Sequence, residues 1–432
     1  MDEPFHLACA VEYWSMHSTT LDEENPPIAR AVEVLGPYLA GARTTGLSNP
    51  WDEGIAILAR PKNFDHFLFL FRLGTLPFFL LACLVVGYWA YHYFGKTVAV
   101  FAVGLFTLLP TTLTDAGLGT TDMALAASTG AAFLTTMPWA EKPSWRRALL
   151  MGGCTALAIL SKFSAIGYLP TSLFLAVLCY CSVKRVAPPE LIGVAAQRLR
   201  TFALALATVA LLVWAAYWFS FEPIRRLGIG LPAPGFLHGL VVFFGHSRAG
   251  VFSFLLGRYS PTGWWYYFPV ALAVKTPIAF LILTALGIVT CTRRRGQLMY
   301  LLPLAFVVGV LLPAMASRVD LGIRHIGPAY VGLSIIAALG LQKLLQQTHY
   351  RLLANALAVA LVGWMTISVA FHHPDYLAYF NEFAGKHPER ILVDSNYDWG
   401  QDLRFLSARL RQLGARQVAL ISFDGDGSDT HR

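Results

Sequence analysis

The sequence predicts an all-α protein that crosses a membrane many times. Of its 432 residues, 56% are hydrophobic and only 13% are charged, and the mean hydropathy is +0.54. A soluble domain carries about 25% charged residues. The apolar residues form long runs, and Lys and Arg gather in short groups between these runs. A soluble protein of this composition would expose a large apolar surface, so we expect a polytopic membrane protein.

Ten apolar stretches approach the length of a membrane span, which needs about 17–25 residues. Basic residues fall in alternate connections between these stretches, as they do in cytoplasmic loops. The alternation holds only if 147–183 crosses twice, with a turn at 161–164. The net charge of +8 therefore indicates membrane topology rather than a nucleic-acid-binding face. The expected spans lie near 73–93, 97–113, 120–137, 147–161, 164–183, 201–221, 268–292, 298–316, 326–344 and 352–371.

This topology divides the chain into three parts. We expect an external first segment over 1–72, a membrane domain of about ten spans over 73–371, and an external segment over 372–432. Both ends then lie on the outer face of a plasma (inner) membrane. Nothing in 1–72 would carry that segment across, so we expect that a transmembrane helix precedes it in the complete protein.

The last part predicts a short, truncated α/β segment. "RILVDS", "DLRFLSARLRQLGA" and "RQVALISF" are typical of a strand, an amphipathic helix and a second strand. Asp394, Asn396 and Asp398 have the spacing of a calcium loop. An EF-hand requires Gly at the sixth position and Glu at the twelfth, where this chain has Trp399 and Phe405. The pattern therefore excludes an EF-hand.

Ionisable residues recur at the predicted outer ends of the spans. Such groups are costly at a membrane boundary unless they serve a site or find partners. Carboxylates together with Lys, Arg and His on one face would suit a reaction on an anionic lipid, with the cations holding its phosphate. The residues are Asp2, Glu3 and Glu24 in the first segment, Asp122 in "GLGTTDMALA", Lys162 in "LSKFSAI", and Arg324 and His325 in "DLGIRHIGPAY".

The stretches "DEPFH", "ENPPIA", "TTDMA", "SKFSA" and "GIRHIGP" together resemble the motifs of a known family. They are similar to those of the membrane-embedded C-type glycosyltransferases of family 39, which include protein O-mannosyltransferases and lipid A aminoarabinose transferases. "GWWYYFPVALAVKTP" and "DYLAYFNEFAG", followed by "DSNYDWGQDL", look closer to a bacterial branch of that family. The resemblance runs from residue 2 to about residue 403.

The resemblance implies a C-type glycosyltransferase architecture and a polyprenyl-phosphate-linked sugar as donor. It implies transfer to an acceptor on the outer face, with inversion at the anomeric carbon. By position, Asp2 matches the family's first-loop acid, a candidate base or acceptor-positioning group, and Glu3 is its companion. Asp122 matches the second-loop acid, and Lys162 matches a lysine that grips the lipid phosphate. Glu24 matches an acid that binds a divalent metal in some relatives.

Each of these residues also has a simpler interpretation. Asp122 is suited to cap a helix, and Lys162 to snorkel from the end of a span. His325 fits an ordinary satisfied polar residue. Asp22 and Glu23, in the same acidic run as Glu24, are expected to be solvated. The aromatic run 264–267 is typical of an interfacial belt.

Two other functions remain open from the sequence. A transporter or flippase of lipid-linked sugars would have a similar composition, but it should place charge near mid-bilayer on interrupted helices. A non-catalytic membrane protein of envelope assembly is the other alternative. The predicted charges gather at one face, which favours an enzyme over a transporter. We expect a hexosyl- or pentosyltransferase that uses a lipid-phosphate sugar donor. The sequence identifies neither the sugar nor the acceptor, which is a protein or a lipid glycan.

Overall fold

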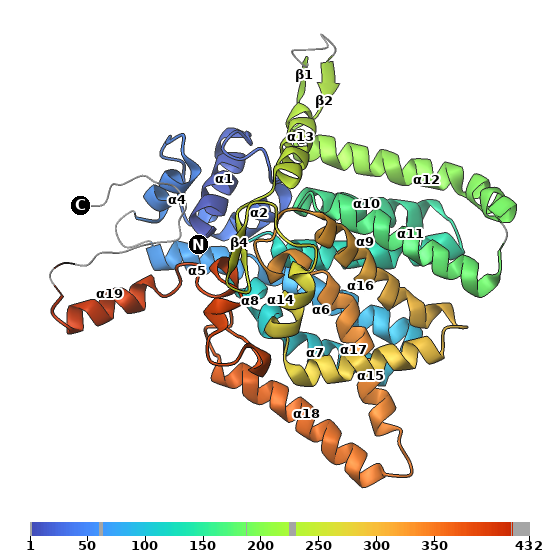
Figure 1. Cartoon of the computed structure of the whole chain (residues 1–432). Helices are drawn as coiled ribbons and strands as arrows, with labels where there is room; N and C mark the ends of the chain where they lie inside the picture. The colour runs from blue at the N-terminus through green and yellow to red at the C-terminus, as the bar shows by residue number, and fades with distance from the viewer. Residues whose placement is uncertain (1, 60–63, 187, 224–229, 416, 418–432) are drawn as a thin grey trace.

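The computed structural model describes residues 2–59, 64–186, 188–223, 230–415 and 417. It is an all-α membrane architecture, as predicted, with two short antiparallel hairpins (Figure 1). A helix lies over each of the ten predicted spans. These helices are α5 (Phe64–Leu73) with α6 (Leu76–Phe94), α7 (Lys96–Thr107) with α8 (Pro110–Gly117), α9 (Asp122–Glu141), α10 (Trp145–Ser161), α11 (Ala165–Lys184), α12 (Pro188–Ala216), α14 (Tyr267–Lys275) with α15 (Ile278–Arg293), α16 (Leu298–Ala316), α17 (Ala329–Leu345) and α18 (Arg351–Phe371).

Within the described chain, 5 helices are long and apolar enough to cross a membrane, or up to 7 if each of two bent pairs is one span. The pair α7–α8 bends by 67° and the pair α14–α15 by 117°. The prediction of one continuous span over 268–292 is therefore wrong. The helix breaks at Pro277, which precedes the first residue of α15. Thr276 is extended, at φ −108° and ψ 133°, because a residue before proline avoids the helical region.

Helices α9 and α17 form the centre of the bundle. Most of their residues are buried, including the whole of Ala329–Leu341. Two glycines let α15 and α17 come together at backbone distance. A Cβ added at Gly340 would lie 2.1 Å from the carbonyl oxygen of Leu283, and one at Gly287 would lie 1.9 Å from that of Ile336. Small residues at such crossings are typical of helices packed in membranes.

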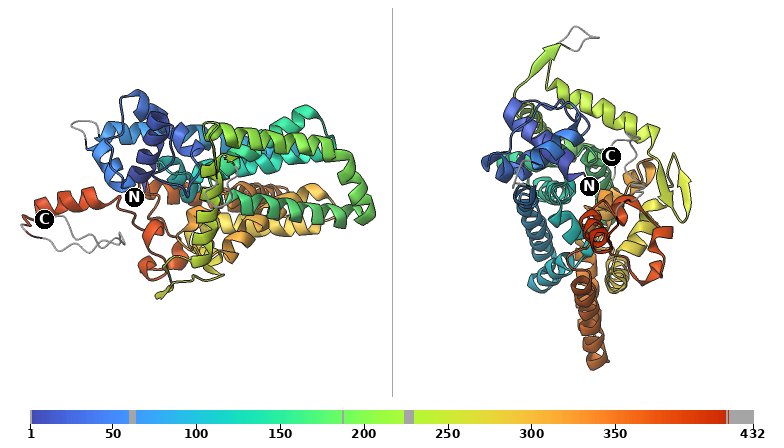
Figure 2. Two further views of the ribbon diagram at one scale, coloured as in Figure 1. Left: turned by 90° about the horizontal axis from the view of Figure 1, so that it is seen from above. Right: turned by 90° about the vertical axis from the view of Figure 1, so that its left-hand side faces the viewer.

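The remaining elements lie at or near one end of this bundle. They include α1 (Glu3–Met16), α2 (Ile28–Glu33), α3 (Leu35–Leu39) and α4 (Pro50–Leu58), which gather with the C-terminal segment at the same end (Figure 2). We call this the site end, because α9 begins, α10 ends and α17 begins there. The connection after α12 adds β1 (Phe221–Pro223), β2 (Gly230–Pro232), α13 (Pro234–Ala249), β3 (Ser253–Leu255) and β4 (Arg258–Ser260).

The C-terminal segment differs in part from its predicted form. The amphipathic helix is present as α19 (Leu403–Gln412). The segment expected as the first strand instead forms turns, with 3-10 helices at Pro388–Arg390 and Asp394–Asn396. Hydrogen bonds from these turns to α14 and to the loop before α17 replace strand pairing. The expected second strand falls almost entirely outside the described residues.

Candidate functional site

A buried carboxylate, Asp122, lies between two cations at the site end. Asp122 is the first residue of α9 and is 1% exposed. Lys162 Nζ lies 2.7 Å from Asp122 Oδ1, and Arg324 Nη1 lies 3.6 Å from Asp122 Oδ2. Helix α9 has Thr121 as its N-cap, without a side-chain cap bond. Asp122 therefore serves an ion-pair cluster, and the capping interpretation is wrong.

Lys162 is directed inward. It follows the last residue of α10 in an extended conformation, with φ −161° and ψ 137°. This conformation takes its side chain out of the helical path, and only 13% of the side chain is exposed. Its ammonium meets Asp122 instead of water, so the snorkelling interpretation is also wrong. One of its three N–H donors is used in this contact.

Arg324 contacts the carboxylates of both Asp2 and Asp122. It lies in the 3-10 helix Ile323–Ile326 and its side chain is 14% exposed. Its Nη1 and Nη2 lie 3.3 Å and 3.2 Å from Asp2 Oδ2. Burial alone would lower the pKa of Arg324, but the carboxylates of Asp122 and Asp2 outweigh it and raise this pKa. The guanidinium is thus permanently charged, and its Nε–H is buried without a partner among the described residues.

His325 lies beside the cluster as a neutral ring. Its Nε2 is buried and has no hydrogen-bond partner in the described chain. Burial lowers the pKa of His325 well below its usual value, and the nearby charges of Lys162 and Arg324 lower it further. Tyr168 Oη donates to the backbone carbonyl of His325 at 3.0 Å. The ring can therefore offer a hydrogen bond to a ligand, but it does not add a positive charge.

Glu3 is fully engaged by other residues. Arg72 donates to both of its carboxylate oxygens at 2.7 Å, and the amide of Gly119 donates to Oε1 at 2.9 Å. Glu3 is 1% exposed. This bidentate pair connects the start of α1 to the end of α5 and to the turn before α9. The geometry assigns Glu3 to positioning α1, which begins one residue after Asp2.

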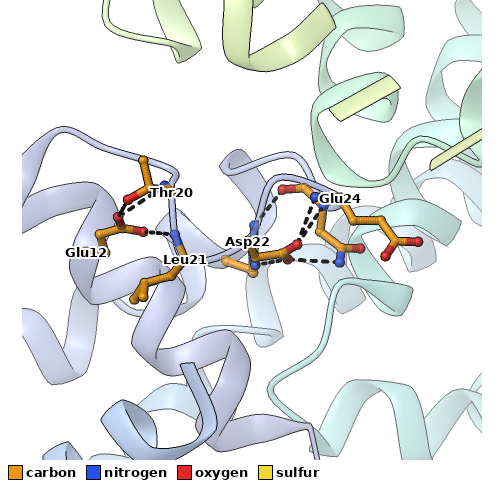
Figure 3. A network of polar contacts seen from close by, with 7 residues as sticks. Glu12, Thr20, Leu21, Asp22 and Glu24 are labelled. Atoms are coloured by element: carbon orange, nitrogen blue, oxygen red, sulfur yellow. Dashed lines mark hydrogen bonds and ion pairs between the residues drawn. The ribbon is translucent and has the colours of Figure 1, made fainter. Parts of the chain in front are cut away.

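The second acidic run forms a folded loop rather than a solvated one (Figure 3). Asp22 is 8% exposed and pairs with the buried Arg30 at 2.7 Å. Asp22 Oδ1 also accepts the amide N–H of Glu24 at 2.9 Å. The expectation that Asp22 is solvated is therefore wrong, because this acid neutralises a buried arginine. Nearby, Glu12 accepts the amide N–H of Leu21 at 3.1 Å and closes the preceding turn.

Glu23 and Glu24 lie toward the surface of the same loop. Glu23 is 44% exposed and lies 2.6 Å from His238, and Glu24 is 33% exposed and lies 2.7 Å from His246. Within the described residues, no group of three or more His, Cys, Asp or Glu side chains could hold a metal ion. No step is therefore assigned to a metal, and metal binding by Glu24 stays a prediction.

A narrow pocket opens next to the ion-pair cluster. Sequence reasoning missed three residues that line it with Asp122 and Arg324: Asp115, Lys275 and Trp399. Lys275 is an ionisable residue inside an apolar run, and this signal could have identified it. Trp399 lies in the stretch "DSNYDWGQDL" that resembles the family, but the sequence predicted no role for it. The other lining residues are Thr111, Thr114, Leu118, Thr120, Ile323, Tyr376, Leu377 and Ser395.

The arrangement of helices is similar to that of a solved structure. ArnT from Cupriavidus metallidurans bound to undecaprenyl phosphate aligns with a TM-score of 0.56 and 18% identity, over 86% of this chain and 67% of that one. The apo state of ArnT aligns with a TM-score of 0.54 and 17% identity, over 86% and 72%. The fold is that of a C-type glycosyltransferase. No model of a protein family and no curated protein matches the chain.

The buried position of Asp22 gives a test of the loop that follows α1. In Asp22→Asn, Arg30 stays buried without its counter-charge. Removing one partner of a buried ion pair typically costs about 3–5 kcal/mol, so we expect a clear fall in the melting temperature of the purified protein. Glu23→Gln is the matched control, because exposed pairs contribute about 0–1 kcal/mol. Equal melting temperatures for the two variants would contradict the structural role of Asp22.

Proposed function

We propose that the protein is a glycosyltransferase that moves a sugar from a polyprenyl-phosphate donor to an acceptor at the outer face of the membrane, with inversion. The observation that carries the proposal is the convergence of Lys162 and Arg324 on Asp122, with Asp2 on the same arginine. The C-type fold supports it, and so does the similarity to ArnT, which was solved bound to undecaprenyl phosphate.

The cations of the site would hold the donor phosphate. Lys162 uses one of three donors, and Arg324 Nε–H has no partner among the described residues. Both can donate to phosphate oxygens in charge-assisted hydrogen bonds. Asp122 keeps the two cations in place, since their mutual repulsion would otherwise separate them. His325, as a neutral ring, would add a hydrogen bond to the same phosphate.

The chemical step follows from this placement. An acceptor oxygen attacks the anomeric carbon, the bond from that carbon to the phosphate oxygen breaks, and the phosphate leaves with the bonding electrons. Lys162 and Arg324 stabilise the negative charge that grows on it. Carboxylates nearby favour the oxocarbenium-like centre. The acceptor loses its proton to a base as the new bond forms.

Asp2 is the residue we assign to that base. It is 25% exposed, whereas Asp122 is 1% exposed and is also held by Lys162 at 2.7 Å. An incoming phosphate can replace this carboxylate on Arg324 more easily than it can displace Asp122. The replaced carboxylate is then free to accept a proton. Glu3 contributes by fixing the start of α1.

The orientation in the membrane follows from the positions of basic residues. Helix ends opposite the site end carry them in groups, which supports a cytoplasmic location for those ends. This supports our proposal that the site faces the outer side of the plasma (inner) membrane. A hexosyl or pentosyl donor, a family 39 relationship and an O-mannosyl chemistry stay predictions. The basic residues are Lys96, Lys142, Arg146, Arg147, Lys184, Arg185, Arg293, Arg294, Arg295, Lys343 and Arg351.

One observation favours a second candidate, a transporter of lipid-linked sugars. The bent pairs α7–α8 and α14–α15 resemble the interrupted helices around which transporters build their sites. The ion-pair cluster, however, lies where α9 begins and α10 ends, rather than at the middle of spans. Movement of a lipid-linked sugar across vesicles without sugar transfer would favour this candidate.

The phosphate-binding role of Lys162 is tested by Lys162→Met in the full-length protein. Removing a charge-assisted hydrogen bond typically costs about 1.5–3 kcal/mol, so we expect undecaprenyl phosphate to bind roughly 10- to 150-fold more weakly. The affinity can be measured by microscale thermophoresis in detergent. Lys343→Met is the matched control, because Lys343 is exposed at the opposite end of α17. Unchanged affinity in a folded Lys162→Met protein would remove Lys162 from the phosphate site.

The role of Asp2 is tested by Asp2→Asn, which removes the basic carboxylate but retains its size. Because Asn competes with phosphate for Arg324 less strongly, we expect undecaprenyl phosphate to bind at least as tightly as in the wild type. General-base catalysis typically contributes about 10²–10⁴-fold, so sugar transfer should fall by that amount. The measurement is single-turnover transfer in proteoliposomes, with Glu23→Gln as control. Near-normal transfer would exclude Asp2 as the base.

A further inference from the structure

The segment after the last span returns to the site and contacts the loop that carries Arg324. We call residues 394–399 the return turn. Ser395 Oγ donates to the carbonyl oxygen of Leu321, and Asn396 Oδ1 accepts the amide N–H of Ile323 at 3.0 Å. A Cβ added at Gly322 would lie 2.6 Å from Ser395 Oγ. The backbone directly before Arg324 is therefore held at close range by side chains of the return turn.

Asn396 is itself fixed on the opposite side. It is 1% exposed, and its Nδ2 donates to Tyr267 Oη at 3.0 Å. Its carbonyl oxygen accepts from Lys275 Nζ at 2.6 Å, and the same ammonium donates to the carbonyl of Leu377 at 2.7 Å. Both partners, Tyr267 and Lys275, belong to α14. A buried polar network with its partners in place is rigid, so the return turn connects α14 to the Arg324 loop.

Trp399 holds the side chain of Arg324 directly. The Cζ atom of Arg324 lies 4.0 Å from the centre of the Trp399 ring, which is a cation–π contact. The carboxylates of Asp2 and Asp122 contact the terminal nitrogens of the same guanidinium. Trp399 also lines the pocket beside Asp122. Together these contacts fix the position of the guanidinium and leave its Nε–H without a partner in the described chain.

We propose that the return turn is part of the active site, in which Asn396 positions the backbone of the Arg324 loop and Trp399 positions the guanidinium for the donor phosphate. This inference rests on the proposed function for the identity of the ligand. The contacts themselves rest only on the geometry of this chain. The membrane domain alone would then have an incomplete site, and the segment after α18 completes it.

The experiment uses the full-length protein in detergent, with undecaprenyl phosphate as the probe. Cation–π contacts contribute about 0.5–2 kcal/mol, so Trp399→Ala should weaken binding roughly 2- to 30-fold. Trp399→Phe keeps an aromatic face and should bind more tightly than Trp399→Ala. Glu389→Gln, an exposed change outside the return turn, should match the wild type. Trp399→Ala added to Arg324→Ala should have no further effect, because Trp399 acts through Arg324.

A second measurement needs no ligand. In Asn396→Ala, the amide of Ile323 loses its acceptor, so hydrogen exchange over 320–327 should be faster than in wild type and in Glu389→Gln. Additive effects of Trp399→Ala and Arg324→Ala on binding, or unchanged exchange over 320–327 in Asn396→Ala, would overturn the positioning role. Faster exchange in Asn396→Ala, with no binding of undecaprenyl phosphate by wild type, would instead support the positioning role and contradict the proposed function.

Discussion

The structure of the site depends on the need to neutralise one buried carboxylate. Asp122 is 1% exposed at the start of the most buried part of α9, where an unpaired charge would be strongly destabilising. Its partners come from distant parts of the chain, since Lys162 follows α10 and Arg324 precedes α17. Pairing therefore brings three helix ends together. Arg324 also contacts Asp2, and this contact holds the start of α1 beside the other three helix ends.

The same cluster explains how a charged ligand could bind so close to the apolar bundle. Two cations and two carboxylates nearly cancel, so the cluster by itself is not strongly charged. A phosphate that replaces Asp2 on Arg324 preserves this balance and leaves Asp122 in place. The partners of Glu3, Arg72 and the Gly119 amide, keep α1 near the cluster during such an exchange. The site therefore combines a fixed carboxylate with one that can be released.

Much of the fold could be predicted from the sequence, because long apolar runs and alternating basic loops report directly on membrane helices. The break at Pro277 was missed because the residues on both sides of it are similarly apolar.

Asp122, Lys162 and Arg324 were predicted to share one face, and the structure brings them together with Asp2. Their pairing required tertiary structure, since Lys162 and Arg324 lie far apart in the chain. The prediction that Asp22 is solvated was wrong. An acid beside two others is typical of a solvated run, but Asp22 forms a buried ion pair with Arg30. Trp399 and Asn396 lie in the stretch "DSNYDWGQDL" that resembles the family. Their positioning role could not be predicted, because their partners lie in other parts of the chain.

The most direct test of this account is a cryo-electron microscopy structure of the full-length protein with undecaprenyl phosphate bound. The account predicts phosphate density within hydrogen-bonding distance of Lys162 Nζ and Arg324 Nε, with the Asp2 carboxylate moved away from the guanidinium and Asp122 still between the two cations. Phosphate density away from both cations, with the contact between Asp2 and Arg324 intact, would contradict it.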